Sequence, residues 1–289
     1  ACATLAALTS AYHLPIEPME TALLAQKIGH SIAGEACGAW APIAATLGRR
    51  QRVLAVQRQP HETAEELPLP EGWRVVALRT DMRGASRGSG CLRARTAAAM
   101  VQTVVTQAIK DLGMRKGPAG GYLANVSAEH FQRYFAPMMP ESISGQEFLE
   151  AYGAPADRLA RVEPGELYTP RADAARLFAQ SARARAFVEQ LRAAQAGDAR
   201  VRHAAMLEAR AILAANTDPL DGERAGGAPV GGMTAVLVQE GAETEAEMAS
   251  LAKELRAGSG QAQVLFGEPG SGAAESPAVR VGLAELLSR

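Results

Sequence analysis

Met233-Thr234-Ala235-Val236-Leu237-Val238 begins the most clearly patterned third of the chain. Its run of apolar and β-branched residues predicts a buried strand. The acidic, amphipathic residues 244–256 predict a helix, and two short apolar runs predict strands at 262–266 and 278–281. The resulting order β-α-β-β corresponds to half of a split βαβ layer, so this end of the chain favours the α+β class.

Similar patterns extend towards the N-terminus. Residues 73–78 predict a buried strand, and residues 92–112 predict a long helix with one apolar face. The inward residues predicted for that helix are Met100, Val104, Val105 and Ile109. Further helices are predicted at 3–12, from Pro18 onward, and at 127–135, 146–152, 173–196 and 202–215. The arginines of the last two helices are expected on solvated faces rather than on phosphate.

An acidic stretch bounded by proline, residues 62–70, separates a short predicted strand at 52–56 from the strand at 73–78. This stretch is the best candidate for an internal boundary. We therefore expect two domains, residues 1–72 and residues 73–289.

Length and composition indicate a globular protein, because 289 residues with 47% hydrophobic and 21% charged residues can bury a stable core. The net charge of −1 provides no field that would attract a nucleic acid, so we expect no such partner. The opening residues lack the basic segment that is typical of a signal peptide, and no later stretch approaches the length of a membrane span, so we expect no membrane partner. The three cysteines, Cys2, Cys37 and Cys91, form no C-x-x-C pair and are interpreted as reduced thiols of a cytoplasmic protein.

Searches for general motifs identify no active site. The glycine clusters at 84–90, 226–232 and 267–272 lack the spacing of a phosphate-binding loop and predict turns, although the middle cluster precedes a strand and is the best candidate for an anion nest. The five histidines are scattered, so we expect no metal site. No G-x-S-x-G sequence supports a hydrolase.

Three segments resemble the galactokinase family, and its L-arabinokinase-like members in particular. Residues 24–38, LAQKIGHSIAGEACG, are similar to the family's L-x-Q-K-V-E-N-x-x-V-G-x-P-C-G. Residues 122–152 are similar to a run that is found in the arabinokinase-like members, Y-L-x-N-x-S followed by aromatic residues, proline and x-G-x-x-F-x. Residues 227–238 resemble a closing glycine loop and strand in shortened form.

The resemblance implies a GHMP-type kinase fold, with a truncated ribosomal-S5-like region followed by a ferredoxin-like domain. It also implies transfer of the γ-phosphoryl group of ATP, with Mg²⁺, to the anomeric hydroxyl of a monosaccharide such as L-arabinose or D-galactose. Catalysis of this kind depends on positioning and on neutralising phosphate charge. The positions assigned to substrate are Gly34, Cys37, Gly38, Arg83 and Arg95. The positions assigned to nucleotide are Gly231 and Gly232.

The sequence departs from the family where the chemistry needs carboxylates. Gly29 stands at the position of the magnesium-binding Glu, and Ala41 stands at the position of the catalytic Asp. The family's sugar-side Asp-Tyr pair falls on Gly90-Cys91, and Pro229 removes one N–H donor from the shortened loop. Glu35 and Asp81 are the two carboxylates considered as replacements. Loss of a general base costs on the order of 10²- to 10⁴-fold in rate, so these changes predict impaired catalysis.

Three interpretations remain open at this point. The first is a sugar-1-kinase homologue with impaired catalysis, and the second is a non-catalytic pseudokinase that binds sugar or nucleotide or acts as a scaffold. The third is a decaying gene product without a ligand. Because the chain begins in mid-helix, without an initiator Met, we expect a fragment. A truncated N-terminal region with exposed strand edges favours a protein partner or a missing N-terminal segment.

Overall fold

The computed structural model describes residues 1–33, 38–57, 62–80, 87–113, 122–155, 157, 160–214, 233–241, 246 and 262–265. The chain is divided into two compact units, Ala1–Leu54 with Pro269–Arg289, and Ala55–Glu268. Helices are combined with small sheets, which confirms the predicted α+β class. The predicted boundary after Gly72 lies in a turn of the second unit, where Gly72 has a φ of 77°, and the division into 1–72 and 73–289 stays a prediction.

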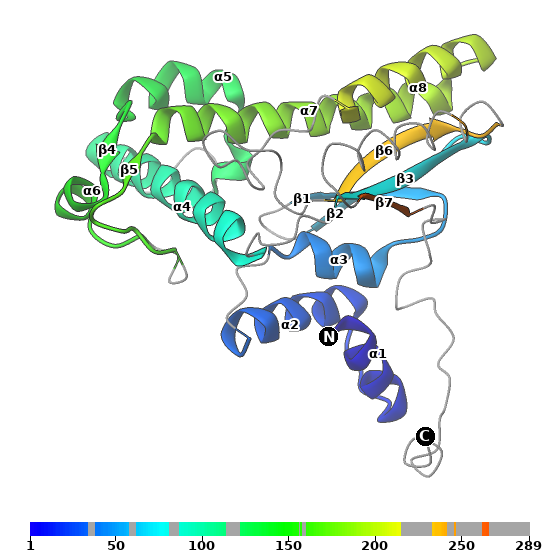
Figure 1. Ribbon diagram of the computed structural model, residues 1–289, viewed down its shortest axis with the longest axis horizontal. Coiled ribbons are helices and arrows are strands. Elements are labelled where there is room, and N and C mark those ends of the chain that lie inside the picture. Colours follow the sequence, from blue (N-terminus) through cyan, green and yellow to red (C-terminus); the bar gives the residue numbers. More distant parts are fainter. Residues whose placement is uncertain are drawn as a thin grey trace. The chain divides into compact units, whose positions relative to one another are not determined.

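The described part of the first unit contains three helices (Figure 1). They are α1 (Cys2–Ala11), α2 (Pro18–Ser31) and α3 (Trp40–Leu47). The helices predicted at 3–12 and from Pro18 onward are confirmed, and Pro18 occupies the first turn of α2, where its missing N–H leaves no helical bond unmade. Helices α2 and α3 pack together and bury Ala22, Ala25 and Ile43, whereas α1 buries no residue.

Helix α3 is not predicted from the sequence. With eight residues it is too short to show a clear period, and it contains Pro42. The structure places Pro42 in the first turn, where proline is tolerated because the N–H groups of that turn have no intrahelical acceptor.

Strands β1 (Arg52–Gln57) and β2 (Glu62–Pro68) form a two-stranded sheet. Most of the stretch proposed as the internal boundary, residues 62–70, therefore forms a strand. The acidic composition did not indicate a strand. In the structure, Leu67 is buried and Glu65 forms an ion pair with Arg192, whose Nη2 lies 2.5 Å from a carboxylate oxygen of Glu65. Leu67 and the Glu65–Arg192 ion pair hold this strand, and the overall composition reveals neither contact.

A three-stranded sheet has β3 (Trp73–Thr80) at its centre, between β6 (Met233–Gln239) and β7 (Ala262–Leu265). Both outer strands run antiparallel to β3, with Trp73 opposite Gln239 and Ala77 opposite Leu265. The strands predicted at 73–78, 233–238 and 262–266 are confirmed. The helix predicted at 244–256 and the strand predicted at 278–281 lie outside the described residues, apart from residue 246.

The described part of the second unit also contains long helices (Figure 1). The longer ones are α4 (Arg87–Asp111), α7 (Pro170–Ala196) and α8 (Ala199–Ala214), and α8 packs against both α7 and β6. Shorter elements lie between α4 and α7. These are η1 (Leu123–Asn125), α5 (Ala128–His130), the π-helical turn η2 (Phe131–Phe135), η3 (Ala136–Met138), β4 (Ile143–Ser144), α6 (Gly145–Tyr152) and β5 (Leu167–Tyr168).

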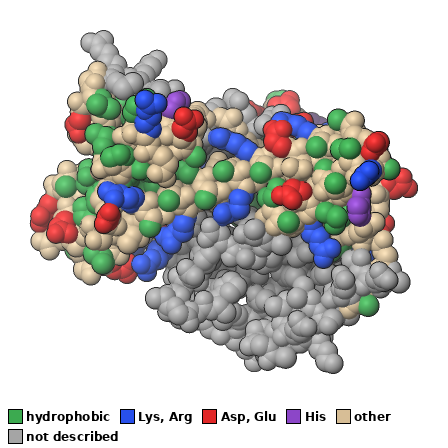
Figure 2. Space-filling model, turned by 90° about the horizontal axis from the view of Figure 1, so that it is seen from above, with side chains coloured by type: hydrophobic (Ala, Val, Ile, Leu, Met, Phe, Trp, Pro, Cys, Tyr) green, Lys and Arg blue, Asp and Glu red, His purple; other side chains and the backbone are tan. Residues whose placement is uncertain are grey.

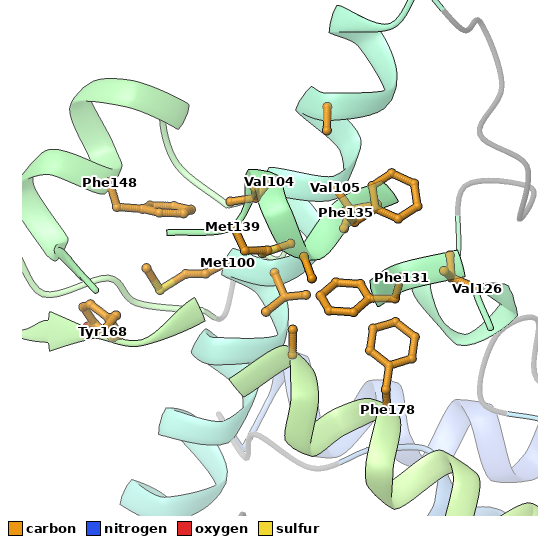
Figure 3. Close-up of a cluster of buried hydrophobic side chains, with 14 residues drawn as sticks. Met100, Val104, Val105, Val126, Phe131, Phe135, Met139, Phe148, Tyr168 and Phe178 are labelled. Atoms are coloured by element: carbon orange, nitrogen blue, oxygen red, sulfur yellow. The ribbon is translucent and has the colours of Figure 1, made fainter. Parts of the chain in front are cut away.

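The main hydrophobic core of the second unit lies between α4, α7 and these shorter elements (Figure 3). The helical period predicted its α4 face correctly, because Met100, Val104 and Val105 are buried and Ile109 packs partly buried beside them. Phe131 is completely buried and stacks on Phe178, with ring centroids 4.4 Å apart.

Charged side chains of both signs are interspersed over the face seen in Figure 2, along which α7 and α8 lie. Arg171 and Arg192 illustrate the pattern, because each remains partly exposed while pairing with a nearby carboxylate, Glu141 and Glu65 respectively. These two arginines of α7 thus lie on a solvated face, as predicted.

Candidate functional site

Gly29 lies in the last turn of α2 and is partly buried. At the other end of α2, the backbone N–H of the N-cap residue, Glu17, donates to the Glu20 carboxylate at 3.1 Å. The resemblance assigns a carboxylate for Mg²⁺ to position 29, but the side chain of Gly29 is only a hydrogen atom. A carboxylate oxygen is the usual protein ligand of Mg²⁺, so the residue present does not fit the ion.

Ala41 is the second residue of α3, and its methyl group is exposed. No acidic residue occurs in the first turn of this helix, and its N-cap, Ala39, makes no side-chain hydrogen bond. The position assigned to a catalytic Asp is thus on the surface at a helix N-terminus, where a carboxylate would be electrostatically favoured. A methyl group there can neither accept a proton nor balance a positive charge.

Gly38 precedes α3 and is exposed. A Cβ atom at this position would lie 2.8 Å from Cδ1 of the Trp40 indole, a side chain that is itself 62% exposed. Glycine at this position therefore allows the indole to lie close to the backbone. The structure places Gly38, Trp40 and Ala41 together at the beginning of one helix.

Arg95 lies on α4, and its guanidinium is bound by a carboxylate of the protein. Its Nε and Nη2 donate to the two carboxylate oxygens of Asp157 at 2.5 and 2.8 Å. The two side chains are 21% and 29% exposed, so the pair is partly screened from water. A bidentate pair fixes the plane of the guanidinium, and in this structure Arg95 thus faces a residue of the segment between α6 and β5.

The other predicted site residues cannot be placed. Gly34, Cys37, Arg83, Gly231 and Gly232 lie outside the described residues, as do the two carboxylates considered as replacements, Glu35 and Asp81. Their assignments to sugar and nucleotide stay predictions.

Several residues of the 122–152 run, which resembles arabinokinase-like proteins, have structural roles. Ser127 caps α5 by accepting a hydrogen bond from the His130 N–H at 3.1 Å. Phe131 and Phe148 are completely buried, and Figure 3 shows both side chains in the core. Gly145 has no room for a side chain, because a Cβ atom would lie 1.9 Å from the carbonyl oxygen of Glu163. The most specific part of the resemblance therefore corresponds to packing and capping.

Perturbed pKa values in this region also reflect structure. The Ser144 backbone N–H and hydroxyl donate to the Glu147 carboxylate at 2.9 and 2.7 Å, and these bonds lower the pKa of Glu147. Burial raises the pKa of the Tyr168 phenol, against the opposing effect of a hydrogen bond from the Glu163 N–H. The first pair caps α6 and the second lies at the core, so neither group is placed as an acid or base for a substrate.

Asp157 is the residue that sequence reasoning missed. It is separated from Arg95 by 62 positions, and no periodic pattern or motif connects the two. The only signal was an Arg-rich, Asp-containing stretch after Gly153-Ala154-Pro155, which predicts a turn but no partner.

No described helix is both long and apolar enough to be a candidate for crossing a membrane. Within the same part of the chain, no three His, Cys, Asp or Glu side chains come together as a potential metal site.

Comparison with known proteins gives a distant relationship. No family model matches the sequence. The chain is similar to L-arabinokinase of Arabidopsis thaliana, with 23% identity over 207 residues, which cover 64% of this chain and 20% of that protein. The matched part thus spans about a fifth of the length of the relative. The comparison supports a distant relationship between this chain and a sugar kinase.

Proposed function

We propose that this chain is a homologue of ATP-dependent monosaccharide 1-kinases that act on L-arabinose or D-galactose, and that its own catalysis is impaired. The observation that carries the proposal is the exposed methyl group of Ala41 on the first turn of α3. The resemblance assigns this position to the Asp beside the reacting sugar hydroxyl. Without it the hydroxyl has no anionic neighbour there, a loss that typically costs on the order of 10²- to 10⁴-fold.

The missing carboxylate at Gly29 supports the same conclusion. ATP and Mg²⁺ are the cofactors that the resemblance implies, and phosphoryl transfer depends on the ion to neutralise charge on the β- and γ-phosphates. Since Gly29 offers no carboxylate oxygen, we assign no metal-dependent step to this chain. Gly34, Cys37, Gly38 and Arg83 are proposed for the sugar, and Gly231 and Gly232 for the nucleotide.

The proposal includes the fold, a truncated ribosomal-S5-like region followed by a ferredoxin-like domain. Support comes from the sheet of the second unit, in which β6 and β7 are both antiparallel to β3 and are therefore parallel to each other with β3 between them. A split βαβ unit has this strand arrangement.

A coupled ADP-release assay with L-arabinose and with D-galactose tests the impaired catalysis. We expect no sugar-dependent release of ADP above the rate without sugar. Sustained turnover that Glu35→Ala abolishes would refute the proposal, because it would show that another carboxylate serves the sugar hydroxyl.

The alternative, a non-catalytic pseudokinase, is favoured by one observation. The 122–152 run keeps a packed core and formed helix caps, whereas positions 29 and 41 lack their carboxylates. A thermal shift with ATP, ADP and each sugar tests it, because a ligand at about 100 times its Kd stabilises by roughly 2.7 kcal/mol. A reproducible shift without turnover supports the pseudokinase, and no shift with any ligand contradicts it.

A further inference from the structure

Several contacts attach the segment from Gly153 to Glu166, between α6 and β5, to the rest of its unit. Its inner end, nearest β5, is held by backbone atoms. The Gly145 N–H donates to the Glu166 carbonyl at 2.8 Å, and the Gln146 N–H donates to the Pro164 carbonyl at 3.0 Å. These bonds involve no side chain of α4.

The outer part of the segment, which contains Asp157 and Arg161, is hydrogen-bonded to α4. Arg95 binds Asp157 through two hydrogen bonds, as described above. The adjacent Thr96 is buried, and its hydroxyl both accepts a hydrogen bond from the Arg161 N–H and donates one to the Arg161 carbonyl, each at 3.2 Å. Two consecutive residues of one helix thus hold two points of the segment.

We propose that Arg95 is a positioning residue, which acts through Asp157 to hold the outer part of the 153–166 segment against α4. The resemblance assigns Arg95 to the sugar side, and the ion pair indicates that it works there by fixing this segment. The inference deepens the proposed function and rests on it only in placing this part of α4 near the sugar. The attachment itself stands on the geometry of the two side chains.

Arg161 makes the attachment measurable, because its side chain is exposed while both of its backbone groups are bound to Thr96. Trypsin must take the chain after Arg161 in an extended form, which requires those two bonds to break. When opening and closing are fast, cleavage follows the population of the open form. The cleavage rate after Arg161 therefore reports release of the outer part.

Limited trypsinolysis of the whole chain, followed by mass spectrometry, tests the proposal. Arg95→Gln and Asp157→Asn should each raise the rate of cleavage after Arg161 about tenfold, as loss of a partly buried, charge-assisted pair implies. Arg95→Lys should lie between, because an ammonium cannot form both parallel bonds. The double variant should cleave no faster than the faster single variant, since both remove the same interaction.

Arg93→Gln is the matched control, because Arg93 is an exposed arginine on the same helix, and its cleavage rate should equal that of the unaltered chain. Wild-type rates in both single variants, or fully additive effects in the double variant, would overturn the proposal. Asp157→Asn keeps the size of the side chain, so it serves if Arg95→Gln does not fold.

Ligand thermal shifts, measured on the same proteins, separate the two hypotheses. If the unaltered chain gives no shift with L-arabinose, D-galactose or ATP while the cleavage pattern holds, the proposed function fails and the positioning role stands. If the sugars shift the melting temperature equally in the unaltered chain, in Arg95→Gln and in Arg95→Lys, Arg95 does not position the segment for a ligand. The expected result is a reduced sugar shift in Arg95→Gln that Arg95→Lys partly restores.

Discussion

The two regions that carry the resemblance differ in what their side chains do. In residues 122–152 several matched side chains fill the core or cap a helix, as Phe131, Phe148 and Ser144 show, although the matched Tyr122 and Tyr134 are exposed. At the ends of α2 and α3, the positions assigned to chemistry are Gly29 and the exposed Ala41. A core position tolerates few side chains, whereas a surface position tolerates many. The comparison teaches that the matched core positions keep side chains that packing requires, whereas the two positions assigned to carboxylates are occupied by glycine and alanine.

Replacement of a core residue should show the strongest effect. Phe131→Ala removes a fully buried ring that stacks on Phe178 and leaves a cavity, so we expect a loss of about 3 to 5 kcal/mol in the free energy of unfolding. Tyr134→Ala is the matched control in the same π-helical turn, where Tyr134 is 51% exposed, and it should cost less than about 1 kcal/mol. Urea denaturation measures both, and equal losses would contradict a structural role for this match.

A second test adds one methyl group to the glycine of the matched run. In Gly145→Ala the new Cβ would lie 1.9 Å from the Glu163 carbonyl oxygen, and because that oxygen belongs to the backbone we expect a loss of roughly 1 to 3 kcal/mol. Gly165→Ala is the control, because a Cβ there meets nothing within 4 Å. Thermal melts should separate the two variants, and a harmless Gly145→Ala would show that the 163–166 backbone is not fixed.

Helix capping provides a smaller, pH-dependent effect. Ser144→Ala should cost about 1 kcal/mol at neutral pH, since it removes the N-cap of α6. The pKa of Glu147 is lowered in the folded state, so its carboxylate stabilises the fold at pH values above the unfolded-state pKa. This stabilisation is lost as pH falls through the lower folded-state pKa.

The difference in stability between the unaltered chain and Glu147→Gln should therefore be largest above about pH 4.3 and shrink at lower pH. Ser127→Ala is the control, because the residue at N3 of its helix is His130 and no glutamate returns its hydrogen bond. A Glu147→Gln effect that is independent of pH would contradict the capping assignment.

The weakest effect is expected at the position assigned to catalysis. Ala41→Asp puts a carboxylate in the first turn of α3, which should stabilise by about 0.3 to 1 kcal/mol through the helix dipole. Ala45→Asp, in the last turn of the same helix and also exposed, should destabilise by a similar amount. Equal effects of the two changes on the melting temperature would show that the end of the helix does not matter here.

The fold was predictable wherever a long periodic pattern decided it. The spacing of Met100, Val104 and Val105 predicted the inward face of α4, and the apolar run at 73–78 predicted the central strand. Short or composition-driven elements were not predictable. Helix α3 is one residue longer than two turns and contains Pro42, and β2 is acidic yet held by Leu67 and by the Glu65 pair with Arg192.

The carboxylate positions of the candidate site were predicted from the sequence as missing groups. Sequence comparison assigned Gly29 and Ala41 to positions that need carboxylates, and the structure places Ala41 on an exposed helix N-terminus. The sequence did not reveal that Arg95 is bound by Asp157, because a contact between residues 62 positions apart depends on how α4 and the segment after α6 fold. Such a pair has no local signature in the sequence.

The most direct test of the central claim is a search for product under conditions that favour even a single turnover. The unaltered chain would be incubated for hours, at a concentration equal to that of ATP, with Mg²⁺ and excess L-arabinose or D-galactose, and sugar 1-phosphate would be measured by mass spectrometry. The account predicts no more product than in a reaction without protein. Formation of sugar 1-phosphate in an amount comparable to the protein would contradict it.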